Sequence, residues 1–169
     1  MSVEAICLQF CAETLKTMCG RIETCVAKLT PEQIWARGSD NQNAVGNLML
    51  HLAGNVRQWI LHGVGGQPDH RQRDTEFAAR ELGVDELKRR LRSTVDEAAT
   101  LIRAAPHAIL TERRSIQKYD VTVLEAILHV TEHFSGHTAQ IILLTKALTG
   151  QDLGFYWHLS PPAQAAKQP

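Results

Sequence analysis

Residues 128–141, LHVTEHFSGHTAQI, place histidines four residues apart at positions 129, 133 and 137. This spacing brings side chains to one face of an α-helix, so the stretch predicts a helix with a histidine-bearing face. At about 100° of rotation per residue, His133 and His137 fall inside the apolar stripe of this helix, whereas His129 falls at the edge of that stripe. Two of the three imidazoles are therefore expected to face the protein core.

A pair of inward-facing imidazoles needs a physical explanation, because a buried polar group without a partner is costly. Coordination of one metal ion by both rings provides an explanation, since each imidazole offers one ring nitrogen. The residue after His133 is Phe134, so the glutamate of the H-E-x-x-H metalloprotease motif is missing and such a protease is not expected. The alternative interpretation is that these histidines are hydrogen-bonded core residues.

A third metal ligand is expected from residues 47–59, NLMLHLAGNVRQW, which predict a second inward-facing helix. His51 lies on the same helix face as Leu48 and Trp59, and Asn55 follows one turn later on that face. Three imidazoles with one open coordination position are typical of a catalytic-type site for zinc or a similar first-row ion. Asn55 is expected either to orient a bound molecule or to be a hydrogen-bonded core residue.

The rest of the chain predicts helices joined by polar loops, which makes the fold class all-α. Four long helices are expected over residues 2–29, 44–62, 83–105 and 122–148, with a short helical turn at 30–35. The predicted N-terminal caps are Thr30 with Gln33, Asn43, Asp85, and Thr122 with Glu125. Residues 112–120, ERRSIQKYD, are expected to be an extended connection, and no hairpin dipeptide predicts a strand pair. Four long helices in one chain indicate a four-helix bundle.

Composition narrows the class of protein. The 169 residues are expected to form one domain over residues 1–160, with a flexible C-terminal tail at 161–169. The 18 basic and 18 acidic residues cancel, so nucleic acid is not an expected partner. The N-terminal segment lacks a basic region, and no apolar run is long enough to span a membrane. A cytoplasmic protein without a membrane partner is therefore expected.

All four cysteines lie in the first 25 residues, at positions 7, 11, 19 and 25. Cys7, Cys11 and Cys25 share a helix face with apolar residues, which favours small, buried, reduced side chains. A thiolate metal site that uses Cys7 and Cys11 is the alternative, but no C-x-x-C pair and no nearby histidine supports it.

Two segments carry a family resemblance. Residues 43–60, NAVGNLMLHLAGNVRQWI, and residues 122–141, TVLEAILHVTEHFSGHTAQI, together resemble the DinB/YfiT-like superfamily. The resemblance implies an up-down-down-up four-helix bundle that holds a divalent metal, often nickel or zinc, through three histidines. Carried over to this chain, these ligands are His51, His133 and His137. The chain departs from the pattern at Ala139, where a glycine is frequent, and this change concerns close packing more than metal ligation.

The resemblance also implies a class of chemistry. Characterised relatives include thiol-dependent S-transferases that use low-molecular-weight thiols such as mycothiol or bacillithiol, and a mycothiol-dependent maleylpyruvate isomerase. A small-molecule substrate, an open metal position and a homodimer are therefore expected. Asn55, His129 and Gln140 are expected near the metal or at the mouth of its pocket. No residue is assigned as catalytic, and a hydrolase-like enzyme, a non-catalytic or stress-related metal-binding bundle and a plain interaction module are kept as alternatives.

Overall fold

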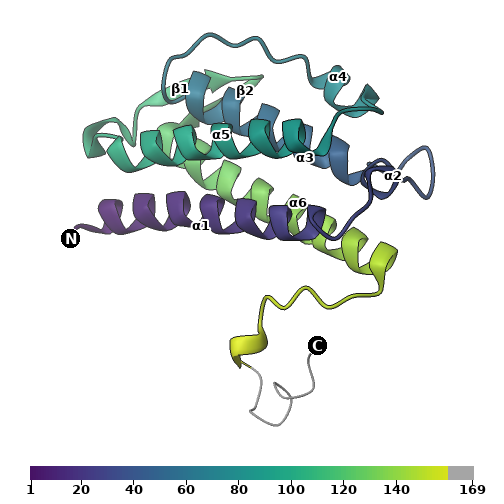
Figure 1. Cartoon of the computed structure of the whole chain (residues 1–169). Helices are drawn as coiled ribbons and strands as arrows, with labels where there is room; N and C mark the ends of the chain where they lie inside the picture. The colour runs from purple at the N-terminus through teal and green to yellow at the C-terminus, as the bar shows by residue number, and fades with distance from the viewer. Residues whose placement is uncertain (160–169) are drawn as a thin grey trace.

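The structure is a computed structural model that describes residues 1–159; the predicted tail, residues 161–169, lies outside the described residues. The described chain is mostly helical and includes one small two-stranded sheet (Figure 1). Its α-helices are α1 (Val3–Val26), α2 (Pro31–Ile34), α3 (Val45–Val56), α4 (Arg73–Ala78), α5 (Val84–Ala104) and α6 (Val123–Thr149). A π-helical segment, η1 (Arg57–His62), continues α3, and two 3₁₀ turns, η2 (His107–Ile109) and η3 (Trp157–Leu159), complete the helical elements.

The long helices bury one apolar face each. Helix α1 packs against α5 and α6, and α3 packs against the same two helices from the other side; Figure 1 shows α1 and α5 lying side by side. The four predicted long helices are confirmed in position, although α1 ends at Val26 rather than near residue 29. The apolar stripe of α5 is buried along its whole length, at Leu87, Leu91, Thr94, Val95, Ala98 and Ile102. No helix within residues 1–159 combines the length and the apolarity needed to cross a membrane.

The four cysteines are free thiols, and three of them are fully buried in the core face of α1. Burial raises the pKa of the Cys19 thiol to about 12, so this group stays protonated at neutral pH. Among residues 1–159, the thiols join no cluster of three side chains that could hold a metal ion. The interpretation of the cysteines as small apolar core residues is favoured over the thiolate metal site.

Two of the predicted helix caps are wrong. Helix α3 has Ala44 as its N-cap instead of Asn43, and the backbone N–H of Ala44 donates to Asn47 Oδ1 over 3.3 Å. The cap thus comes from a side chain inside the first turn. Helix α5 has Gly83 as its N-cap instead of Asp85, which lies in the first turn of the helix. A carboxylate in that position interacts favourably with the helix dipole without being the cap.

The other two predicted caps are confirmed. Thr30 with Gln33 caps α2, and Thr122 with Glu125 caps α6, each as a reciprocal capping box. At the other end of α6, Gly150 adopts a left-handed conformation with φ 67°, which is the usual glycine stop for a helix. Helix α6 therefore has a defined start and a defined end. These fix the position of its histidines along the helix axis.

The extended connection between α5 and α6 forms a hairpin that was not predicted. Strands β1 (Arg113–Ile116) and β2 (Tyr119–Thr122) pair antiparallel, with Ile116 opposite Tyr119. The turn holds Gln117 at φ 57°, a conformation that glycine or asparagine usually provides at such turns. The sequence lacks those residues here, which explains why the turn signal was missed.

Candidate metal centre

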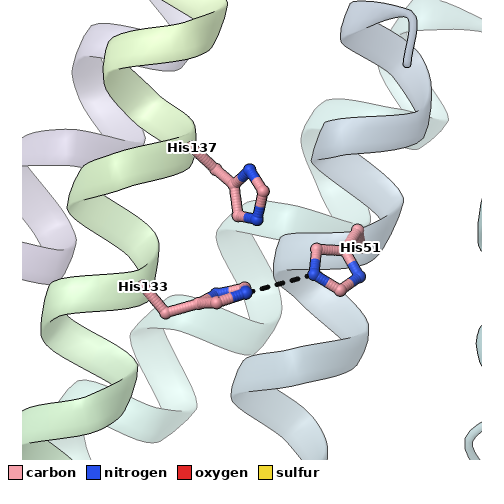
Figure 2. A group of neighbouring side chains, drawn as sticks. All are labelled: His51, His133 and His137. Atoms are coloured by element: carbon pink, nitrogen blue, oxygen red, sulfur yellow. Dashed lines mark hydrogen bonds between the residues drawn. The ribbon is translucent and has the colours of Figure 1, made fainter. Parts of the chain in front are cut away.

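The three predicted ligands come together between two helices. His51 projects from α3 toward His133 and His137 on α6 (Figure 2). One nitrogen of each ring lies within 4.8 Å of the others, and His51 Nε2 is 3.2 Å from His133 Nε2. His51 is buried, and the other two rings are half-buried. The group could hold a metal ion.

The donor set suits a first-row divalent ion. Two imidazole nitrogens bound to one tetrahedral zinc ion, each at about 2.0–2.1 Å, lie roughly 3.3 Å apart. The separation of 3.2 Å between His51 Nε2 and His133 Nε2 matches this value. Three imidazole nitrogen donors without a carboxylate or thiolate favour zinc, nickel or copper over magnesium or calcium, which prefer oxygen ligands.

Two of the three rings are oriented by hydrogen bonds at Nδ1, the ring nitrogen that is not offered to the metal. His51 Nδ1 lies 3.2 Å from Glu76 Oε2, and His137 Nδ1 lies 2.7 Å from Gln140 Oε1. We infer from these acceptors that each Nδ1 carries the proton, which leaves each Nε2 lone pair free for a metal. His133 Nδ1 is buried, and within residues 1–159 it has no hydrogen-bond partner.

The two rings on α6 are held in the uncharged form that metal coordination requires. Burial, with the neighbouring rings of His137 and His51, lowers the pKa of His133 to about 3. Burial also lowers the pKa of His137, against the opposing effect of its hydrogen bond to Gln140. Both imidazoles are therefore neutral at pH 7, so neither ring carries the second proton that would prevent metal binding.

A buried ion pair supports His51. Arg71 Nε donates to Glu76 Oε1 over 2.7 Å, and Arg71 Nη2 donates to Glu76 Oε2 over 2.8 Å. The side chains of Arg71 and Glu76 are only 3% and 11% exposed. Burial alone would raise the pKa of Glu76, but hydrogen bonds from Arg71 and His51 outweigh this effect and hold the pKa below its usual value. Glu76 is thus an ionised acceptor for the His51 ring.

Arg71 Nη2 also lies 3.1 Å from His51 Nδ1. An Arg nitrogen can only donate, and the Nδ1 atom cannot accept this bond while it donates to Glu76. The bond from Nδ1–H to the carboxylate is the one consistent with Nε2 as a metal ligand, and Arg71 already has Glu76 as its acceptor. We therefore assign the Nδ1 proton to the Glu76 bond.

Neither Arg71 nor Glu76 was predicted from the sequence, because both come from the irregular segment around α4. Asn47 holds this segment against α3, since its amide nitrogen donates to the carbonyls of Glu76 and Ala79, each over 2.9 Å. Gly54 leaves room for the ion pair, because a Cβ atom at this position would overlap Glu76 Oε1. The sequence feature that could have indicated a segment packed here is the stripe of Asn47, His51 and Gly54, which share one face of α3.

A cavity of about 450 Å³ opens beside the histidines. His51 and His133 contribute to its wall, so a ligand in the cavity would lie next to the metal position. The rest of the wall comes from α3, η1, the α4 segment, the hairpin and α6, through Asn55, Trp59, Arg71, Arg73, Gln117, Tyr119, Val121, Glu125 and His129. The volume falls within the range of small-molecule pockets.

The three flanking residues predicted near the site occupy different places. Asn55 is 4% exposed and lines this cavity, and its Oδ1 atom has no hydrogen-bond partner among residues 1–159. His129 stays outside the three-histidine group, as its helical angle predicts, and its ring packs at a tilt against Trp59 with 4.2 Å between the ring centroids. Gln140 is exposed and contacts His137 from the far side of the ring.

Comparisons with known proteins give a family match and a structural likeness but assign no activity. The family described as "Protein of unknown function (DUF1572)" matches residues 3–161. No curated protein matches the chain significantly. The crystal structure of a "conserved protein of locus from Enterococcus faecalis" superposes with a TM-score of 0.73 at 16% sequence identity, covering 89% of this chain and 99% of that one. At this identity the likeness shows the fold alone.

Proposed function

The chain belongs to the DUF1572 family of proteins of unknown function, and we propose that it binds one divalent ion, nickel or zinc, through His51, His133 and His137. The observation that carries this proposal is the convergence of three imidazoles, two of them with Nδ1 hydrogen-bonded to an acceptor, which directs Nε2 toward the shared position. Structural zinc sites usually have four protein ligands. Three ligands leave a position for a substrate or water.

We also propose that the chain belongs to the DinB/YfiT-like superfamily. The two histidine-bearing segments resemble the DinB/YfiT-like superfamily, and the packing of α1 and α3 on both α5 and α6 is compatible with its up-down-down-up four-helix bundle. We place the DUF1572 chain in this superfamily on that basis. The same resemblance supports a homodimer.

The activity that we propose is thiol-dependent group transfer to a small electrophile. A bound divalent metal lowers the pKa of a thiol or water molecule and so supplies a nucleophile at neutral pH. The thiolate sulfur forms a bond to an electrophilic carbon, the leaving group departs with its bonding electrons, and the thiol proton passes to solvent. The chain would position the reactants, because His51 and His133 border the cavity and Glu76 holds the His51 ring in its orientation by a hydrogen bond.

Metal analysis of protein purified without a histidine tag tests the site first. We expect about one equivalent of nickel or zinc per chain. The loaded protein is then mixed with a low-molecular-weight thiol and an alkyl halide, and thioether formation is compared with that of the metal-free protein. Metal without thioether formation would favour the non-catalytic metal-binding bundle. Protein that neither contains nor takes up nickel or zinc would overturn the metal proposal.

Gly54→Ala should weaken metal binding while leaving the helix itself intact. The added methyl group would overlap Glu76 Oε1 and crowd Arg71 Nε, so the carboxylate must leave its position behind His51. Loss of such a supporting hydrogen bond typically lowers metal affinity by about 10–100-fold. Alanine favours an α-helix over glycine by about 1 kcal/mol, but disturbing the buried Arg71–Glu76 pair costs more than this gain, so thermal stability should fall as well. Competition with a chromogenic chelator measures the affinity.

Gly20→Ala is the matched control, because a Cβ atom at this position of α1 meets nothing within 4 Å. It should raise the stability by about 1 kcal/mol through helix propensity alone and leave the metal affinity unchanged. Equal metal affinities in Gly54→Ala and the wild type would show that Glu76 does not support the His51 ring.

A further inference from the structure

Part of the wall of the 450 Å³ cavity is aromatic. The ring of Trp59 lies 4.2 Å from that of His129 and 5.9 Å from that of Tyr119, measured between ring centroids. Val121 lies on the same wall. Aromatic rings prefer to contact other rings by their faces or edges, so this wall complements a flat ligand better than a flexible polar one.

Two buried polar atoms in the wall have no partner among residues 1–159. They are the indole nitrogen Nε1 of Trp59 and the amide oxygen Oδ1 of Asn55. Trp59 is 3% exposed and Asn55 is 4% exposed. Buried polar groups are normally satisfied, so a ligand that offers one acceptor and one donor would complete this wall.

The local backbone indicates that this wall is a functional feature. Trp59 belongs to the π-helical segment η1, and π-helical turns inside α-helices occur frequently at functional sites. The hairpin that carries Tyr119 is held against η1, because Gln117 Nε2 donates to Gln58 Oε1 over 2.6 Å. Gln117 is the one non-glycine residue with positive φ among residues 1–159, and such backbone conformations persist where surrounding contacts hold them.

We propose that the cavity selects ligands in which a metal-binding head is joined to a flat aromatic or conjugated ring, with Trp59 and Tyr119 as the residues that recognise the ring. This proposal rests on the metal site proposed above. The head occupies the open metal position beside His51 and His133, and the ring lies against the aromatic wall. A hydrogen-bond donor and acceptor close to the head satisfy Asn55 and the Trp59 indole.

Two hydroxamates test this proposal on the nickel- or zinc-loaded protein. Benzohydroxamate and acetohydroxamate share the same metal-binding head, N–H donor and carbonyl acceptor, and they differ in the phenyl ring. Calorimetric titration should give a dissociation constant about tenfold or more lower for benzohydroxamate, since ring contacts of this kind typically give such a preference. The quenching of tryptophan fluorescence provides a second readout.

Variants of the two aromatic residues test where the phenyl ring of benzohydroxamate binds. Trp59→Leu and Tyr119→Ser should each reduce the preference for benzohydroxamate to about twofold or less. Acetohydroxamate should bind Tyr119→Ser as before but bind Trp59→Leu more weakly, because Trp59→Leu also removes the indole N–H donor that both ligands use. Tyr119 is 59% exposed, so Tyr119→Ser decides the question even if Trp59→Leu impairs folding. Trp157→Leu is the control, because Trp157 lies on η3 and outside the cavity wall.

The outcomes separate the two proposals. Equal binding of both hydroxamates, or a preference that survives both variants, would overturn the ring-binding proposal and leave the metal site intact. Protein that takes up no nickel or zinc would instead overturn the metal site on which this inference rests.

Discussion

A His133→Ala/His137→Ala variant will bind no stoichiometric metal, whereas the wild-type protein will carry about one equivalent of nickel or zinc. The double substitution removes two of the three nitrogens that lie within 4.8 Å of one another. His51 alone cannot hold the ion in competition with chelators, since stable sites in proteins need three or four ligands. Elemental analysis of untagged protein before and after dialysis against a chelator measures the loss.

His129→Ala is the matched control for this experiment. His129 lies on the same helix, one turn before His133, but it is outside the three-histidine group. Its replacement should leave the metal content at about one equivalent. Circular dichroism must show that the double variant keeps its helices. Metal retained by a folded double variant would place the site elsewhere in the protein.

The convergence of His133 and His137 on the core face of α6 could be predicted, because it depends on the helical repeat alone. Once residues 123–148 are taken as a helix, the rotation per residue fixes which histidines face the core. His133 and His137 were assigned to the site, and His129 to its edge, by this rotation alone. The structure brings the first two to His51 and leaves His129 against Trp59.

The supporting residues could not be predicted in the same way. Arg71 and Glu76 lie in and next to the short helix α4, where no periodicity indicates which way a side chain points. Their position depends on tertiary hydrogen bonds from Asn47 and on the space that Gly54 leaves. The hairpin was missed for a related reason, since its turn uses Gln117 instead of a glycine or asparagine.

Arg71→Met should produce the largest loss of stability among single substitutions around the site. Arg71 donates to both oxygens of Glu76 and, through Nη1, to Gln58 Oε1 over 3.0 Å. Methionine removes these donors and leaves a carboxylate that is only 11% exposed without its charge partner. Breaking a buried pair in this way typically costs about 3–5 kcal/mol. Urea denaturation of the metal-free protein measures the effect without a contribution from metal binding.

The same variant should lose metal affinity by about 10–100-fold, because Glu76 without Arg71 tends to take up a proton and then no longer holds His51 as an anionic acceptor. A second variant, Arg71→Met/Glu76→Leu, separates the two effects. Replacing both partners by apolar residues of similar volume should recover most of the lost stability, whereas the metal affinity should stay low, since His51 Nδ1 still lacks its acceptor. Restored metal affinity in this double variant would show that Glu76 does not position the ligand.

The exposed pair of Arg89 and Glu86 on α5 provides the control for the ion pair itself. Its arginine side chain is 68% exposed, and exposed pairs of this kind contribute little to stability. Arg89→Met should therefore unfold at nearly the same urea concentration as the wild type and bind metal equally well. Equal losses in Arg71→Met and Arg89→Met would mean that burial of the Arg71–Glu76 pair has no energetic consequence. A large loss confined to Arg71→Met would instead make this pair the link between the α4 segment and the orientation of His51.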